Sequence, residues 1–243
     1  MQRVADADNA DWNTKGETCM KTKKIKNLVT KAKAELTWLS LELPQDKGPI
    51  RVVSDPDAKI HRIFISPENA EADPRQELLY LHELGHATLC ERVHPFFGAV
   101  FPVTDLDERL VAAVSPVLNA AGDWFVGQWQ TEFCPELALA ELKHEFEAST
   151  ELLSEEQPPT VEKFFVAALV IAQAIKYLKV RDNCDGFLKQ IVHAFLEVPP
   201  ENPSVQKFEL LANKLLELGA PLRCRKVTVE GRDLLQFYPK ANS

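Results

Sequence analysis

Hydrophobic residues in this chain recur mostly three and four positions apart, the spacing that places side chains on one face of an α-helix. The first series begins at Ile25 and continues to Leu43, so it predicts an amphipathic helix that ends near Pro44. Asp73 and Pro74 then offer a cap and a first position for a second helix. This helix should reach about residue 93, and further helices are predicted over about 105–130 (kinked or restarted at Pro116), 135–150, 161–178, 186–196 and 204–218.

Two shorter segments have the composition of β-strands. IRVVS (residues 50–54) and HRIFIS (residues 61–66) are rich in β-branched and aromatic residues, and DPDA between them favours a turn. They are predicted to form a hairpin or neighbouring strands of a small sheet. A second hairpin is predicted across Glu230-Gly231. The expected fold class is therefore α+β, mostly α.

The polar segments suggest how the chain is divided. Residues 1–22 are polar and aperiodic, which predicts a flexible tail. SEEQPPT, at residues 154–160, has the composition of a linker. We therefore expect one domain over residues 23–153 and a helical C-terminal region over residues 154–243.

Composition and charge narrow the function classes. The 243-residue chain has a formal net charge of −8, which argues against broad binding of nucleic acid by a basic face. The N-terminus lacks the apolar segment of a secretory signal. The longest apolar run, Phe164–Ile175, is shorter than the roughly 20 residues of a membrane-spanning helix and is interpreted as a core helix. Five cysteines without a CxxC pair favour free thiols, so we expect a cytoplasmic protein without membrane contact.

The strongest candidate for chemistry is LLYLHELGHATLC, residues 78–90, where two histidines and a glutamate lie in an otherwise apolar helix. His82 and His86 are four residues apart, so they can present two imidazole nitrogens to one point. Glu83 lies about 100° further round the helix and can reach a water held at that point. Two neutral nitrogens, an open position for water and a carboxylate base are what zinc-assisted hydrolysis requires. The motif predicts a Zn²⁺ site with His82 and His86 as ligands and Glu83 as general base.

The same residues also fit an ordinary helix core in which hydrogen bonds satisfy both histidines. Two considerations favour the metal site. The spacing arises by chance in such a chain with a probability on the order of 1%, and burying these polar groups without a partner would be costly. Gly85, between the two histidines, lowers helix propensity but would let another backbone or a substrate approach closely.

HELGHA resembles the active-site helix of the zincin metallopeptidases, and HRIFIS followed by this helix is similar to their small core. The resemblance covers about residues 25–150. It implies a minimal zincin core, in which a small β-sheet accompanies the active-site helix and the helices that follow. It also implies an edge strand that holds a peptide by strand addition. The implied activity is hydrolysis of peptide bonds in a peptide or protein substrate.

A catalytic zinc site needs a third protein ligand. The metzincin pattern would place a histidine where this chain has Arg92, so that subgroup does not fit. In other zincins the third ligand is a carboxylate on a following helix, and Glu108 follows His86 at a distance similar to that in gluzincins. Asp123 is favoured, because an unpaired aspartate among alanines, glycine and aromatic residues would be costly. His94, which precedes a proline, is the remaining candidate.

The segment LNAAGDWFVGQ around Asp123 supports this choice by a second resemblance. It is similar to the N-x-A-x-D segment that follows HExxH in predicted metallopeptidases often joined to von Willebrand A-like domains. Asn119 lies one turn before Asp123 and would support a ligand from the outside.

Two questions stay open at this level. Tyr80, His61, His94 and Arg92 are all candidates for stabilising a developing oxyanion, and the sequence does not choose among them. The alternative to a peptidase is a catalytically inactive zincin-fold module that binds or regulates a partner through the helices after Thr160.

Overall fold

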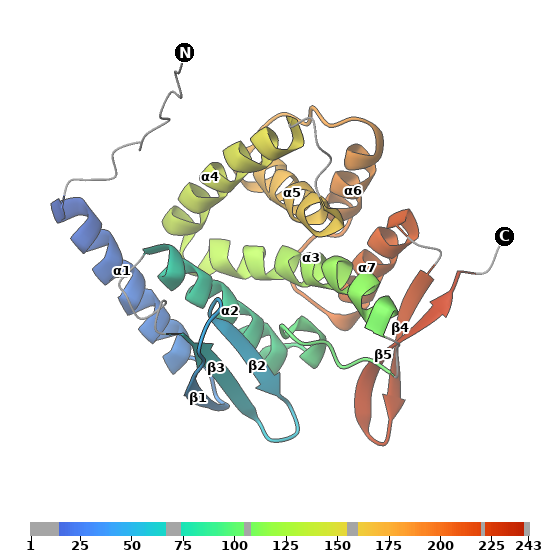
Figure 1. The fold of residues 1–243 in the computed structure, drawn as a ribbon, viewed down its shortest axis with the longest axis horizontal. Helices are drawn as coiled ribbons and strands as arrows, with labels where there is room; N and C mark the ends of the chain where they lie inside the picture. Colours follow the sequence, from blue (N-terminus) through green and yellow to red (C-terminus); the bar gives the residue numbers. More distant parts are fainter. Residues whose placement is uncertain (1–14, 67–73, 105–107, 155–159, 220–221, 241–243) are drawn as a thin grey trace, which may run out of the picture.

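The computed structural model describes residues 15–66, 74–104, 108–154, 160–219 and 222–240, and Figure 1 shows their arrangement. The fold is α+β and mostly α, as the sequence predicts. In chain order the elements are α1 (Lys15–Ala34), β1 (Leu39–Pro44), β2 (Arg51–Asp55), β3 (Ile60–Ile65), α2 (Pro74–Arg92), the short 3₁₀-helix η2 (Pro95–Phe97), α3 (Glu108–Phe133), α4 (Pro135–Ser154), α5 (Val161–Gln173), the π-helical turn η3 (Ala174–Leu178), α6 (Gly186–Leu196), α7 (Val205–Gly219), β4 (Leu222–Val229) and β5 (Arg232–Pro239).

Helix α3 runs through the middle of the molecule, with α2, α4, α5 and α7 packed around it (Figure 1). It continues through Pro116 as a single helix, so the predicted restart there is absent. By length and composition alone, its segment Leu110–Phe133 would be long and apolar enough to cross a membrane. Half of an apolar 18-residue stretch within it is buried inside the protein, and the central helix of a helical core meets the same criteria.

The small sheet has the order β1-β3-β2, with β1 parallel and β2 antiparallel to β3. The pairing of β2 with β3 confirms the first predicted hairpin. HRIFIS supplies the central strand β3, and β1 and β2 are the edge strands. Strand β2 is the edge strand that contacts Glu83 of α2.

The predicted helix over residues 25–43 is wrong in its last part, because α1 ends at Ala34 and residues 39–44 form β1. A contact remote in sequence explains the difference. The carboxylate of Glu91 on α2 accepts the backbone N–H groups of Thr37 at 2.8 Å and Trp38 at 3.0 Å. A continuing helix would use both groups internally, so this carboxylate stabilises the exit from the helix instead. At the other end, α1 begins at Lys15, inside the segment predicted as a tail.

Two hydrophobic clusters form the core. The smaller one joins α1, the sheet and α2, and includes Val29, Val52, Leu81 and Leu84. The larger one surrounds α3 and combines residues from both sides of the predicted linker, such as Trp124 and Phe195. The regions 23–153 and 154–243 therefore share one core.

The C-terminal hairpin is confirmed, since β4 and β5 pair across Glu230 and Gly231. Both turn residues have positive φ, 51° and 79°, as a two-residue type I′ turn requires.

Candidate metal centre

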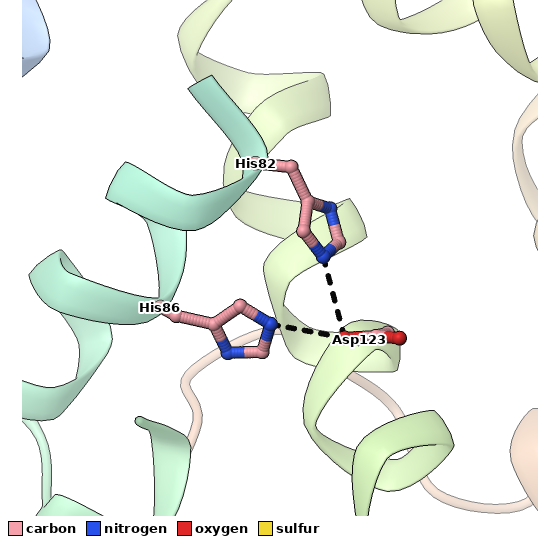
Figure 2. A group of neighbouring side chains, drawn as sticks. All are labelled: His82, His86 and Asp123. Carbon is pink, nitrogen blue, oxygen red and sulfur yellow. Dashed lines mark hydrogen bonds and ion pairs between the residues drawn. The ribbon is translucent and has the colours of Figure 1, made fainter. Parts of the chain in front are cut away.

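Helices α2 and α3 bring three potential metal ligands to one point. His82 and His86 lie one turn apart on α2, and Asp123 faces them from α3 (Figure 2). Oδ1 of Asp123 lies 3.3 Å from Nε2 of His82 and 3.0 Å from Nε2 of His86. One ligand atom from each of the three residues lies within 4.8 Å of the others. The structure thus brings together the three residues that the sequence predicts as metal ligands.

Gly85 permits this approach of the two helices. A Cβ atom at Gly85 would lie only 2.8 Å from side-chain atoms of Trp129 and of Val126, both on α3. Carbon atoms in ordinary contact are about 3.5–4.0 Å apart. The glycine between the two histidines therefore admits the helix that carries the third ligand, which is the close backbone approach that the sequence suggested.

The distances suit a tetrahedral zinc ion. Zinc binds histidine nitrogen and carboxylate oxygen at about 2.0–2.1 Å, which places neighbouring tetrahedral ligand atoms roughly 3.3 Å apart. The two nitrogen–oxygen distances, 3.3 and 3.0 Å, are close to that value. A fourth position would then be open to water, as in catalytic zinc sites.

The outer nitrogen of each histidine is also held. Nδ1 of His86 lies 2.8 Å from the carbonyl oxygen of Phe97, and Nδ1 of His82 lies 3.2 Å from Oε1 of Gln130. A carbonyl oxygen can only accept, so Nδ1 carries the proton in each ring. Nε2 of a neutral ring is then a bare lone pair directed at Asp123, which is the tautomer that metal-binding histidines use.

Charge within the cluster is strongly coupled. Burial acts to raise the pKa of Asp123, but hydrogen bonds from His82 and His86 outweigh it and hold that pKa below its ordinary value. Burial acts to lower the pKa of His82, but Asp123 outweighs it and raises that pKa to about 9. A carboxylate oxygen and two imidazole Nε2 atoms all carry lone pairs, so a cation has to stand between them. Protons on the rings can fill this role, and so can a metal ion.

Glu83, the predicted base, lies against the sheet. Its Oε2 accepts the backbone N–H of Val52 at 2.7 Å. Because this N–H points to α2 and away from β3, the outer edge of β2 borders Glu83. One carboxylate oxygen of Glu83 is therefore fixed by an edge strand of the sheet.

The other third-ligand candidates belong to other parts of the fold. Glu108 begins α3, 15 residues before Asp123, which corresponds to roughly 22 Å along the helix axis; its side chain lies outside the described part of the structure. His94 pairs through Nε2 with Asp233 of β5 at 3.0 Å, and its Nδ1 accepts the N–H of Phe96. Neither is brought to the cluster of His82, His86 and Asp123.

The oxyanion candidates from the sequence also have other partners. Tyr80 donates its hydroxyl to Glu42 at 3.0 Å, and Arg92 donates to the carbonyl oxygen of Glu35 at 3.0 Å. His61 is fully buried between Ser54 and Glu91 and stacks on Trp38. None of them lines the cavity beside the metal ligands.

That cavity has a volume of about 280 Å³ and lies between α2, α3, α4 and α5. His82 and Asp123 are among its lining residues. No pattern in the sequence points to its other polar residues as a group; they include Gln130, Thr131, Glu141, Glu145, Gln173 and Tyr177. Gln130 could have been found, because it lies two turns after Asp123 on the same face of α3. Gln173 and Tyr177 come from a helix much later in the chain, and no local pattern connects them to the motif.

Comparison of the chain with protein-family models, with curated proteins and with solved structures found no match. The resemblance to zincins consequently rests on the sequence segments that suggested it.

Proposed function

We propose that this protein is a zinc-dependent peptidase. One observation carries the proposal. The Nε2 atoms of His82 and His86 converge on the same oxygen of Asp123, while their Nδ1 atoms are fixed by protein oxygen atoms. Two neutral imidazoles and one carboxylate form a donor set that suits Zn²⁺ and leaves one coordination position open.

The residues divide the work as follows. His82, His86 and Asp123 would hold the ion, and Gln130 and the Phe97 carbonyl orient the two rings. Zinc bound there would supply a Lewis acid that lowers the pKa of a coordinated water. Glu83 takes a proton from the attacking water and returns it to the leaving amine. Since Val52 occupies Oε2 of Glu83, Oε1 is the oxygen that exchanges this proton.

The inactive zincin-fold module remains the second candidate, and the position of Glu83 favours it. Glu83 is bound to the sheet and does not line the cavity, whereas His82 and Asp123 do. A protein that kept the fold without catalysis could use Glu83 only to fasten α2 to β2.

Metal content tests the site. We expect one zinc per chain in the wild type, measured by elemental analysis after purification without added metal, and little in Asp123→Ala or His86→Ala. Asp182→Ala is a matched control, because it removes the carboxylate of a different His–Asp pair, His193 with Asp182 at 2.9 Å. Zinc absent from the wild type even after reconstitution would overturn the proposed site.

Activity tests the role of Glu83. The zinc-loaded wild type should cleave members of a peptide library, and Glu83→Gln should keep its zinc and lose about 10²–10⁴-fold in rate, as expected for loss of a general base. A metal-loaded wild type that cleaves no peptide would favour the binding module.

A further inference from the structure

The cavity beside His82 and Asp123 has an apolar lining that could pack against the aliphatic part of a ligand, called its stem below. Leu79 of α2, Leu142 of α4, and Leu169 and Val170 of α5 contribute apolar surface. Its volume of about 280 Å³ lies near the lower end of the roughly 300–1,000 Å³ typical of small-molecule pockets. The space is large enough for one long amino-acid side chain.

Exposure shows which way the cavity opens. Val166 of α5 is 48% exposed, and Glu145 of α4 is exposed as well, so these two lie at the mouth. Glu141 precedes Glu145 by one helical turn and is half-buried. His82 and Asp123 line the same cavity.

The hydrogen-bonding groups of the lining favour a ligand that donates. Three donors of the lining are engaged within the protein. The Thr131 hydroxyl donates to the Gly127 carbonyl at 2.8 Å, and the Tyr177 hydroxyl donates to Gln128 at 2.7 Å. Nε2 of Gln173 lies 3.4 Å from the Asp123 carbonyl oxygen as a donor. No lysine or arginine is among the described residues that line the cavity.

The carboxylates add negative charge to this acceptor-rich lining. Loss of solvent to the surrounding protein raises the pKa of Glu145 and the charge of Glu141 raises it further, while His82 and His144 act to lower it. Negative groups are thus close enough to repel one another at the mouth. A cation placed between them would relieve that repulsion.

We propose that the cavity is a specificity subsite for a cationic group on an apolar stem, with Glu141 and Glu145 as the residues that select it. The inference rests on the proposed peptidase function and names its substrate class: peptides with lysine or arginine next to the cleaved bond. The stem packs on the leucines and valines, and the charged end meets the two carboxylates. A free α-amino group offers the same charge, and the experiment separates the two sources.

Cleavage of paired peptides tests the selection. The two peptides of a pair differ at one position, where one has lysine and the other has norleucine, whose side chain is similar but uncharged. Each peptide is made in two forms, with a free and with an acetylated N-terminus. The zinc-loaded wild type should cleave the lysine member about tenfold faster at one position, whether acetylated or not. The double variant Glu141→Gln/Glu145→Gln should bring the pair close to parity, whereas Glu147→Gln, an exposed α4 residue outside the cavity, should not.

The inference would be overturned if the wild type showed no preference for lysine, or if the preference persisted in the double variant. Either result would leave the peptidase proposal standing. A charge preference found only with free N-termini would assign the subsite to the α-amino group and overturn the side-chain assignment.

Binding keeps the inference testable if no peptide is cleaved. The metal-loaded Glu83→Gln variant is titrated with Nα-acetyl-lysine methylamide and, separately, with the norleucine analogue, while amide NMR signals are followed. Signals of α4 and α5 residues around the cavity should shift with the lysine compound at concentrations at least about fivefold lower. Equal responses to both compounds, or none, would refute the cationic subsite whatever the protein catalyses.

Discussion

Replacing Gly85 by alanine should weaken both the fold and the metal site. The added Cβ would lie 2.8 Å from Val126 and Trp129, so α2 and α3 must separate by about 0.7 Å or more to restore ordinary contact. Val126 is fully buried and β-branched, and Trp129 stacks on Phe133, so neither can easily move aside.

The expected size follows from two opposing terms. Overpacking of a core costs about 1–3 kcal/mol, while alanine gains about 1 kcal/mol of helix propensity over glycine. The difference between these terms is a net loss of up to about 2 kcal/mol in the free energy of unfolding of the metal-free protein. A displacement of 0.7 Å also exceeds the tolerance of about 0.2 Å for metal–ligand distances, so zinc affinity should fall about tenfold or more.

Gly122→Ala is the matched control. A Cβ at Gly122 of α3 would meet Cε1 of His86 at 3.5 Å, an ordinary contact. This variant should keep its zinc and unfold at the same or a slightly higher urea concentration. Urea unfolding and competition with a fluorescent zinc chelator measure both effects. The reasoning is refuted if Gly85→Ala binds zinc as tightly as Gly122→Ala does.

Three further predictions concern neighbouring contacts. Gln130→Leu removes the oxygen that holds His82 and should lower zinc affinity about 10–100-fold in the chelator assay, whereas Gln130→Glu keeps an acceptor and should keep the affinity of the wild type. Equal zinc affinities of the two variants would contradict the role of Gln130. Glu91→Ala leaves two backbone N–H groups and His61 without their acceptor and should cost about 2–4 kcal/mol in urea unfolding, so a cost below about 1 kcal/mol would show that water replaces the carboxylate. Burial lowers the pKa of His61 below its ordinary 6.5 despite the opposing effect of Glu91. The unfolded chain then binds a proton that the folded protein does not, so the free energy of unfolding should fall as the pH drops below about 6.5. In His61→Asn the free energy of unfolding should depend less steeply on pH between about 7.5 and 5.5.

Local patterns were enough for part of this architecture. The four-residue spacing of His82 and His86 places both rings on one face of α2 in any helical context, because helix geometry alone fixes it. The turn between β4 and β5 follows from Glu230-Gly231 in the same local way. Asp123 was also accessible, since a carboxylate among small and aromatic residues calls for a partner.

Contacts between distant segments decided the rest. Leu36, Leu39 and Leu43 continue the helical spacing of α1, yet the carboxylate of Glu91 takes the amide groups at this point and the chain turns into β1. Sequence spacing carries no information about an acceptor that arrives from more than fifty residues away.

The sequence by itself determined which nitrogen and oxygen atoms are available as candidate ligands, and that two of them share a helix face. Only the tertiary structure decided how they meet and what surrounds them. The distance between α2 and α3 depends on Gly85 fitting against Val126 and Trp129. The cavity depends on α4 and on the π-helical turn after α5, which brings Tyr177 to its lining. Such packing arises from shape and burial across the whole core, and no short segment encodes it.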